Sequence, residues 1–188
     1  LSVKGTATVR GGEGSNNFLG DGASQNVMLG ADDDVLNAGG GDDIVGSAGG
    51  NDTISGGSGN DVTFGGIGND SVSGGTGDDK VTDSWGTDAL HGDDGDDVIR
   101  AFEGGDTIDG GAGADTIYGS RGDDVISGGD DSDVIYGDTF VFASRGADEL
   151  SGGNGDDVLQ GGFGADTFVF KSDETGNNRI ERIATQTA

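Results

Sequence analysis

Residues 56–82 read GGSGNDVTF, GGIGNDSVS and GGTGDDKVT, three nine-residue units that follow one another without a gap. Each unit begins with two glycines, has a third glycine at its fourth place and carries an aspartate at its sixth place. Glycine adopts positive φ at little cost, so the GGxG portion favours a tight turn. Places seven to nine are rich in Val, Thr and Ser, which suit a short extended segment. Each nonad therefore predicts one turn followed by one short strand.

The same frame runs from residue 2 to residue 136 as fifteen consecutive nonads, without an insertion or a deletion. The eighth place is apolar in each nonad except one, where Thr63 stands. Side chains alternate across a strand, so place eight must face inward while places seven and nine face water. A turn–strand unit cannot bury such a face alone, and stacking it on its neighbours produces a solenoid. The regular pattern over this length argues against a disordered chain.

We expect an all-β solenoid of parallel strands with two nonapeptides per coil, because each thin strand needs an opposite strand to pack against. Nonads of the same parity then stack directly, and their place-six aspartates form a column along each edge, with carboxylates about 5 Å apart. Like charges at this spacing raise each other's pKa and oppose folding, so a cation must neutralise them.

Calcium suits these turns, because it takes six to eight oxygen ligands from carboxylates and backbone carbonyls. Magnesium demands a tighter octahedral geometry. Softer metals prefer His or Cys ligands, and the chain has one His and no Cys. The predicted cofactor is therefore Ca²⁺, in several copies. The predicted metal ligands are the place-six aspartates Asp34, Asp43, Asp52, Asp61, Asp70, Asp79, Asp88, Asp97, Asp106, Asp115, Asp124, Asp133, Asp148, Asp157 and Asp166.

The charge of the chain supports this choice of partner. Thirty-six acidic residues against nine basic ones give a net charge of −27. This balance argues against nucleic acid and anionic membrane surfaces as partners and favours multivalent cations. The sequence has no apolar run long enough to cross a bilayer, so we expect no membrane insertion. Without cysteine the chain forms no disulfide framework.

The frame breaks once, at GDTFVFASR (137–145). Residues 138–144 echo residues 166–172, which leaves open whether the break is a loop within one roll or a boundary between two rolls. We therefore divide the chain into a degenerate N-terminal cap (1–28), a main calcium-binding roll (29–136), an insertion (137–147), a continuing or second short roll (148–169) and a C-terminal cap or tail without a visible repeat (170–188). The cap assignment depends on Ala7, Asn16 and Gln25, which replace aspartate at place six.

Three nonads depart from the pattern inside the roll. Place four carries Asp32 in one nonad and Asp131 in another, so we expect their turns to be distorted. The unit DSWGTDALH (83–91) replaces both leading glycines with Asp83 and Ser84, which we expect to weaken the carbonyl contacts of that turn.

Units such as GGSGNDVTF (56–64), GGAGADTIY (110–118) and GGNGDDVLQ (152–160) resemble the nonapeptide of repeats-in-toxin (RTX) proteins. The resemblance covers nearly all of residues 38–169, in register. It implies a calcium-binding, right-handed parallel β-roll. In that family such rolls occur in secreted bacterial proteins, are disordered in the calcium-poor cytoplasm and fold outside the cell.

We therefore expect a calcium-binding β-roll in a secreted or cell-surface bacterial protein, such as a surface-layer, adhesin or matrix component. Self-association, or contact with neighbouring surface-layer subunits, is a further expectation. The alternative is a C-terminal folding and export module of a secreted protease, lipase or toxin whose catalytic part lies outside this chain.

No catalytic constellation is visible, so we expect no enzyme activity. His91 stands alone at an outward place, and Trp85 is interpreted as a surface cover rather than a platform for sugars. Asp–Asp steps such as Asp96–Asp97 recur at many turns, whereas a catalytic pair needs only one cleft. We interpret each step as a ligand and a solvated neighbour.

Overall fold

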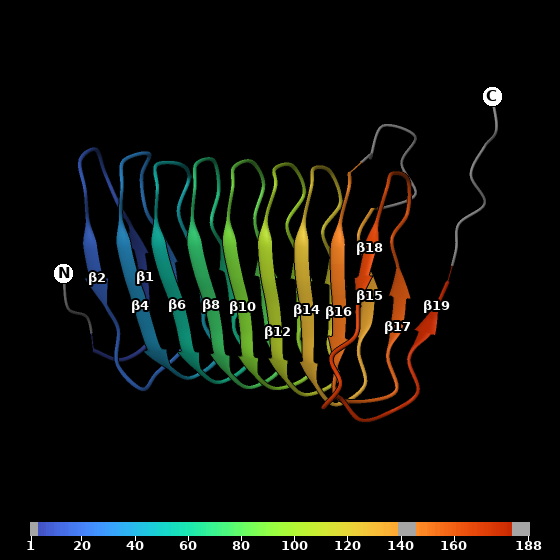
Figure 1. Ribbon diagram of the computed structural model, residues 1–188. Coiled ribbons are helices and arrows are strands. Elements are labelled where there is room, and N and C mark those ends of the chain that lie inside the picture. Colours follow the sequence, from blue (N-terminus) through green and yellow to red (C-terminus); the bar gives the residue numbers. More distant parts are fainter. Residues whose placement is uncertain (1–3, 139–145, 182–188) are drawn as a thin grey trace.

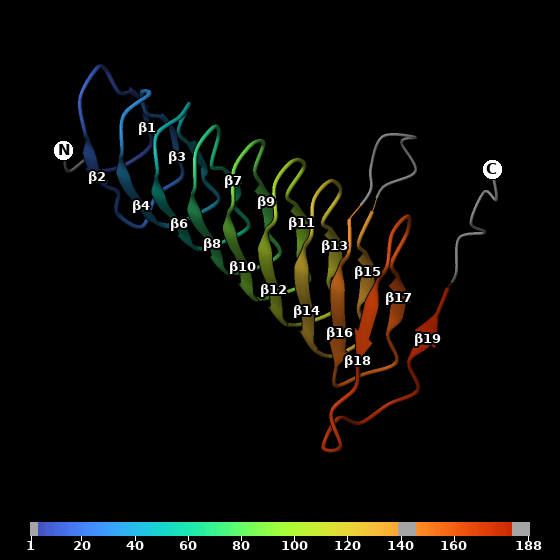
Figure 2. The same ribbon diagram turned by 45° about the horizontal axis from the view of Figure 1, so that its top comes forward.

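The computed structural model describes residues 4–138 and 146–181. Within these residues, nineteen strands form two parallel sheets that face each other, and successive strands of the chain alternate between the sheets. Figure 1 shows the strands stacked side by side along one axis, in chain order from blue to red, and Figure 2 shows the second sheet behind the first. The predicted all-β parallel roll is confirmed.

The strand bounds follow the nonads. The ten-stranded sheet contains β1 (Ala7–Arg10), β3 (Gln25–Met28), β5 (Ile44–Gly46), β7 (Val62–Phe64), β9 (Lys80–Thr82), β11 (Val98–Arg100), β13 (Thr116–Tyr118), β15 (Val134–Tyr136), β17 (Val158–Gln160) and β19 (Arg179–Ile180). The nine-stranded sheet contains β2 (Asn17–Leu19), β4 (Val35–Gly40), β6 (Thr53–Ser58), β8 (Ser71–Thr76), β10 (Ala89–Asp94), β12 (Thr107–Ala112), β14 (Val125–Asp130), β16 (Glu149–Gly153) and β18 (Thr167–Val169).

The register establishes two nonads per coil. Ile54 of β6 lies beside Val72 of β8, which lies beside Leu90 of β10. In the other sheet, Val81 of β9 lies beside Ile99 of β11. Each step joins residues two nonads apart, so every place of the nonad stacks on the same place of the next coil.

The core consists mainly of one column of place-eight side chains from each sheet, to which Leu29, Ala38 and Ala101 add at place one. From Phe18 to Leu159 these side chains are at most 2% exposed, and Val9 and Phe168 are partly buried at the two ends. Fully burying one such side chain contributes about 1.5–3 kcal/mol. Because each nonad supplies only one of them, the interior is thin for a chain of this length.

Glycine is required at the turns because successive coils approach each other backbone to backbone. Gly68, at place four, has φ +140°, and a Cβ there would lie 1.8 Å from the carbonyl oxygen of Gly50. Asp131 stands at the same place of another turn and adopts φ 72°. The expected distortion is therefore absent at Asp131, because aspartate tolerates the left-handed region better than most residues do.

The break at 137–147 does not interrupt the sheets. Strand β14 pairs with β16 and β15 pairs with β17, so Ile126 lies beside Leu150 although the two are 24 residues apart rather than 18. The six additional residues fall between the end of β15 at Tyr136 and the start of β16 at Glu149, and the strand pairing is intact on both sides. Residues 139–145, and with them most of the repeated DTFVFAS segment, lie outside the described residues.

The expectation that the last stretch carries no repeat is wrong for residues 173–181. Strand β19 pairs with β17, with Ile180 beside Leu159. Gly176 has φ +118°, as a place-four glycine does, and the N–H of Asp157 donates to Oδ1 of Asn178 at 3.2 Å. The segment DETGNNRIE is thus a further turn and strand, displaced by three residues (a step of 21).

Replacing Thr63 with valine is expected to stabilise the roll by about 1 kcal/mol. Thr63 is fully buried at place eight of β7, and its hydroxyl oxygen has no hydrogen-bond partner, whereas valine has a similar shape and no polar group. The midpoint of urea denaturation in saturating calcium measures the gain. Thr53→Val is the control, because Thr53 faces water on β6; a loss of stability at position 63 would contradict the prediction.

Candidate metal centre

The place-six aspartates form two columns, one along each edge of the roll. The first edge comprises the turns that lead into the nine-stranded sheet, and the second edge comprises the turns that lead into the ten-stranded sheet. The first edge carries Asp34, Asp52, Asp70, Asp88, Asp106, Asp124, Asp148 and Asp166, and the second carries Asp43, Asp61, Asp79, Asp97, Asp115, Asp133 and Asp157. All except Asp166, which is partly buried, are at most 3% exposed.

One oxygen of each carboxylate is bound to the backbone of the preceding coil. The N–H of Asp52 donates to Oδ1 of Asp70 at 2.7 Å, and the N–H of Asp79 donates to Oδ1 of Asp97 at 2.7 Å. The ladder continues across the insertion, where the N–H of Asp124 donates to Oδ1 of Asp148 at 3.1 Å. At the N-terminal ends of the two columns, Asn16 and Gln25 donate in the same way to Asp34 and Asp43.

The second oxygen of these carboxylates has no such partner. It is buried without a hydrogen bond in twelve of the place-six aspartates: Asp43, Asp52, Asp61, Asp70, Asp79, Asp97, Asp106, Asp115, Asp124, Asp133, Asp148 and Asp157. The ion pairs formed within residues 4–138 and 146–181 lie elsewhere, at Arg121–Glu103 and Arg179–Glu181. An unpaired buried carboxylate is strongly unfavourable, so the oxygens require a proton or a cation.

Burial is the main reason why these carboxyl groups hold protons so tightly. It raises the pKa of Asp61 and Asp97 to about 7 and that of Asp124 and Asp133 to about 8. The backbone N–H bond opposes the shift, and neighbouring carboxylates add to it. Like-charge repulsion, the cause expected from the spacing of the aspartates, contributes less to the raised pKa than burial does.

The unpaired oxygen points into a small cradle beside the place-one glycine. A Cβ placed on Gly92 would lie 2.2 Å from Oδ2 of Asp97 and 2.4 Å from the carbonyl oxygen of Gly110 in the next coil. The same pair of oxygens surrounds the corresponding point at Gly56 and Gly110. A carboxylate oxygen and a carbonyl oxygen thus converge on a space that glycine leaves open.

This donor set fits calcium. The groups that converge at these turns are carboxylate and backbone carbonyl oxygens, the hard oxygen ligands that calcium takes in proteins. A doubly charged ion would supply the positive charge that the carboxylates lack. The residues present therefore match the predicted cofactor in charge, ligand type and repetition.

Comparison with known families agrees with this geometry. The profile of the RTX calcium-binding nonapeptide repeat matches residues 19–54, 46–81, 64–99, 82–117, 109–140 and 136–168, which together span most of the chain. The chain belongs to the RTX calcium-binding repeat family. The resemblance found in the sequence is confirmed, and the RTX repeats bind Ca²⁺. No curated protein matches the chain at a significant level.

In the Asp–Asp pairs of this RTX roll, the two adjacent aspartates differ in burial and in their contacts. In the step Asp96–Asp97, Asp97 is buried, while Asp96 is exposed and accepts the N–H of Ala114 at 2.9 Å. Asn60 and Asn69 accept the N–H of Asp78 and Thr87 in the same way. The place-five side chain therefore accepts a backbone N–H of the next coil, whereas the place-six side chain accepts one of the preceding coil. The exposed place-five residue thus joins two coils and is not only a solvated neighbour, as the sequence had suggested.

Two buried aspartates were not among the predicted ligands. Asp83, at place one, and Asp138, at place two of the turn that contains the insertion, are at most 1% exposed, and each has one oxygen without a partner. The signal for Asp83 was present in the sequence, since an acid stands where other nonads have glycine. The sequence did not single out Asp138, because the nonad frame breaks at residue 137 and its place in the repeat could not be assigned.

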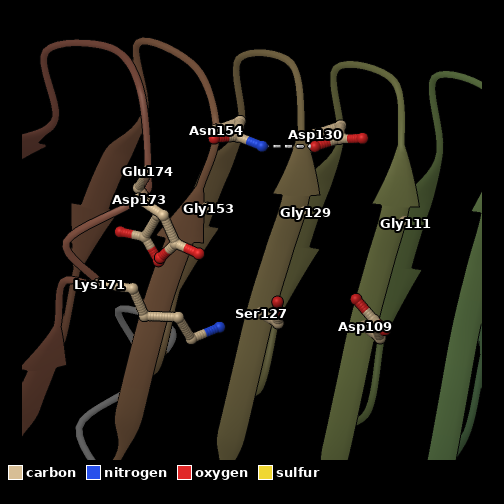
Figure 3. A pocket seen from close by; sticks show the side chains of 10 residues that line it. All are labelled: Asp109, Gly111, Ser127, Gly129, Asp130, Gly153, Asn154, Lys171, Asp173 and Glu174. Carbon is tan, nitrogen blue, oxygen red and sulfur yellow. Dashed lines mark hydrogen bonds between the residues drawn. The ribbon is translucent and has the colours of Figure 1, made fainter.

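A shallow groove of about 370 Å³ lies on the nine-stranded sheet next to the C-terminal coil. Figure 3 shows Lys171 extended over the strands toward Ser127, with Asp173 and Glu174 beside it and Asn154 bonded to Asp130. The lining side chains bring together no nucleophile and base within hydrogen-bonding reach in this part of the described chain. Nor do the described residues include a helix of the length and apolarity needed to cross a membrane.

In calcium-free solution the roll is expected to be more stable at acidic pH than at neutral pH. Because the folded-state pKa of Asp61 and Asp97 is about 7 and that of Asp124 and Asp133 about 8, above the ordinary 3.8, the folded chain binds protons more tightly than the unfolded chain does. This stabilisation is complete below about pH 4 and is lost as the pH rises through 7 to 8.

Circular dichroism in chelator across this pH range measures the effect. We expect β structure to appear on acidification and to disappear by pH 8, where the carboxylates are ionised. A calcium-free chain that is equally structured at both ends of the range would contradict the assignment of the buried carboxylates.

Proposed function

We propose that this chain is a calcium-triggered folding module that operates outside the cell, as part of a secreted or surface-anchored protein. The observation that carries the proposal is the double row of carboxylates, each with one oxygen on the backbone ladder, twelve of which bury a second oxygen without a partner. The place-six aspartates Asp34 to Asp166 are the proposed ligands, two successive coils contributing to each ion.

The energetics link the ion to the fold. One apolar side chain per nonad makes a thin core, while every coil buries two carboxylates, each of which is costly to bury as an unpaired charge. Since the calcium site does not exist in the unfolded chain, binding energy becomes folding energy. A chain of this kind stays unfolded where calcium is scarce and folds where calcium is abundant.

The charge of the module suits this cycle. A net charge of −27 keeps the calcium-free chain extended and soluble through self-repulsion. Calcium then removes the repulsion only where the aspartates are stacked. This behaviour supports export of an unfolded chain followed by folding at the exterior, where the roll serves as a rigid spacer or as a lateral contact in a surface layer, adhesin or matrix.

Calcium titration of the full chain, followed by circular dichroism, tests the proposal. We expect a cooperative gain of β structure with a midpoint in the range of extracellular calcium modules, ~0.1–1 mM, and no comparable gain with Mg²⁺. Each stacked coil supplies ligands to its neighbour, so the transition should be steeper than single-site binding. A spectrum already rich in β structure in chelator at neutral pH would refute the proposal.

Asp97→Asn is expected to raise the calcium midpoint by about tenfold, while Asp96→Asn should leave it nearly unchanged. The two residues are adjacent and carry the same charge, but only Asp97 points a buried, unpaired oxygen into the cradle beside Gly92. Asparagine retains the Oδ1 acceptor at either position, so the backbone ladder survives in both variants. If both variants raised the calcium midpoint equally, calcium binding would depend on the overall charge of the chain rather than on the place-six carboxylate.

A further inference from the structure

The turn of residues 83–88 is unlike the others of the first edge. Place one carries Asp83 where Gly65, Gly119 and Gly137 stand in other turns of this edge. The Asp83 side chain is buried, at 1% exposure, beneath the turn rather than in solvent. An ionisable side chain in this position requires a partner.

Asp83 points into the cradle of the preceding coil. Its Oδ2 lies 1.9 Å from the point where a Cβ on Gly65 would stand, and Oδ2 of Asp70 lies 2.9 Å from the same point. At Gly56 and Gly92 a neutral carbonyl oxygen of the next coil approaches this point instead. One oxygen from each of Asp70, Asp83 and Asp88 lies within 4.8 Å of the other two.

The protein supplies no counter-charge to this trio. Oδ1 of Asp83 accepts the backbone N–H of Ser84, while Oδ2 of Asp83 and Oδ2 of Asp70 have no hydrogen-bond partner. Neither ion pair formed by the described residues includes a member of the trio. Three carboxylates thus face a common space with two buried oxygens unpaired.

Ser47 shows how an uncharged side chain is accommodated at place one. It stands at the same place on the same edge, and its hydroxyl donates to the carbonyl oxygen of Gly30 at 3.1 Å and lies 3.4 Å from Oδ2 of Asp34. The hydroxyl proton satisfies oxygens that face it. Ionised Asp83 has no proton to donate and adds a negative charge in its place.

We propose that Asp70, Asp83 and Asp88 form a three-carboxylate site that binds Ca²⁺ more tightly than the other turns of the roll. The inference deepens the proposed function and rests on it. Calcium affinity rises with the number of charged ligands, and elsewhere each pair of stacked turns offers two place-six carboxylates. This site is therefore the first to fill and the last to empty.

The position of the site gives it a role in folding. It joins β8 and β10, which lie midway along the roll (Figure 1). In a repeat solenoid, folding can start at one coil and propagate to its neighbours. An ion held between these two coils would seed the roll at its centre, and the remaining coils would add toward both ends as their own turns fill with calcium.

Calcium retention by the full chain tests the site. Calcium-saturated wild type, Asp83→Gly and Asp83→Ser are dialysed against decreasing free calcium, and the bound calcium per chain is counted. Wild type should keep one ion per chain at a free concentration about tenfold below that which half-empties the remaining sites; both variants should lose this plateau. Glycine and serine occur at place one elsewhere on this edge, so both variants should fold in excess calcium, which circular dichroism verifies.

Terbium, as a calcium substitute, provides a second readout. Trp85 is the sole tryptophan of the chain and lies in the same turn as Asp83. The first equivalent of Tb³⁺ should therefore produce most of the tryptophan-sensitised emission in wild type, but not in Asp83→Gly. Asp93→Gly is the matched control: it removes one acid from an exposed position of the opposite edge, where φ is 77° and glycine is acceptable, and it should behave as wild type.

Two results would overturn the assignment of Asp83. In the first, Asp83→Gly and Asp83→Ser keep the plateau; in the second, Asp83→Gly binds one ion more than wild type, which would mean that the Asp83 carboxylate blocks the cradle. In either case calcium-dependent folding of all variants would leave the proposed function standing. A wild-type chain that folds in chelator and binds no calcium would instead remove both proposals together.

Discussion

The structure depends on one arrangement, a buried carboxylate that binds the backbone of the preceding coil with one oxygen and leaves the other unpaired. The bound oxygen sets the spacing and register of the coils, because each place-six N–H is aimed at the carboxylate stacked above it. The unpaired oxygen makes the same arrangement unfavourable unless positive charge arrives. Assembly and calcium dependence therefore follow from two atoms of one side chain.

The rest of the roll is adjusted to this arrangement. Many of the strands are only three residues long, and place eight brings one apolar side chain inward per nonad, so hydrophobic burial alone holds the coils weakly. Glycine at places one and four allows the backbones to approach closely enough for the ladder to form. Place-five side chains such as Asp96 support the same turns from outside. The extra residues between β15 and β16 leave the pairing of β14 with β16 and of β15 with β17 intact.

The two edges differ although they repeat the same pattern. Place one of the second edge is glycine from Gly56 to Gly152, and from Gly56 to Gly128 its cradles have the same two kinds of neighbour, an aspartate oxygen and a glycine carbonyl oxygen. The first edge instead has Ser47, Gly65, Asp83 and Ala101 in successive coils. Place one of these successive coils thus presents a hydroxyl, a glycine beside which Asp83 enters, a carboxylate and a methyl group. This variation gives a repetitive roll individual sites, which a uniform array could not have.

The nonad repeat by itself determined the all-β class, the inward face and the place-six aspartates, because a period of nine specifies which residues turn and which point inward. Two nonads per coil was an expectation from packing each thin strand against an opposite strand, and the strand register confirmed it. Only the tertiary structure decided what each oxygen contacts. It showed that burial outweighs repulsion in raising the pKa of Asp61, that Asp83 enters the cradle of another coil, and that Asn178 continues the second edge after a displaced repeat. These facts depend on contacts between residues of neighbouring coils that lie 18, 21 or 24 positions apart in the sequence. Additional residues change this separation along the chain, but the coils still stack in the same way.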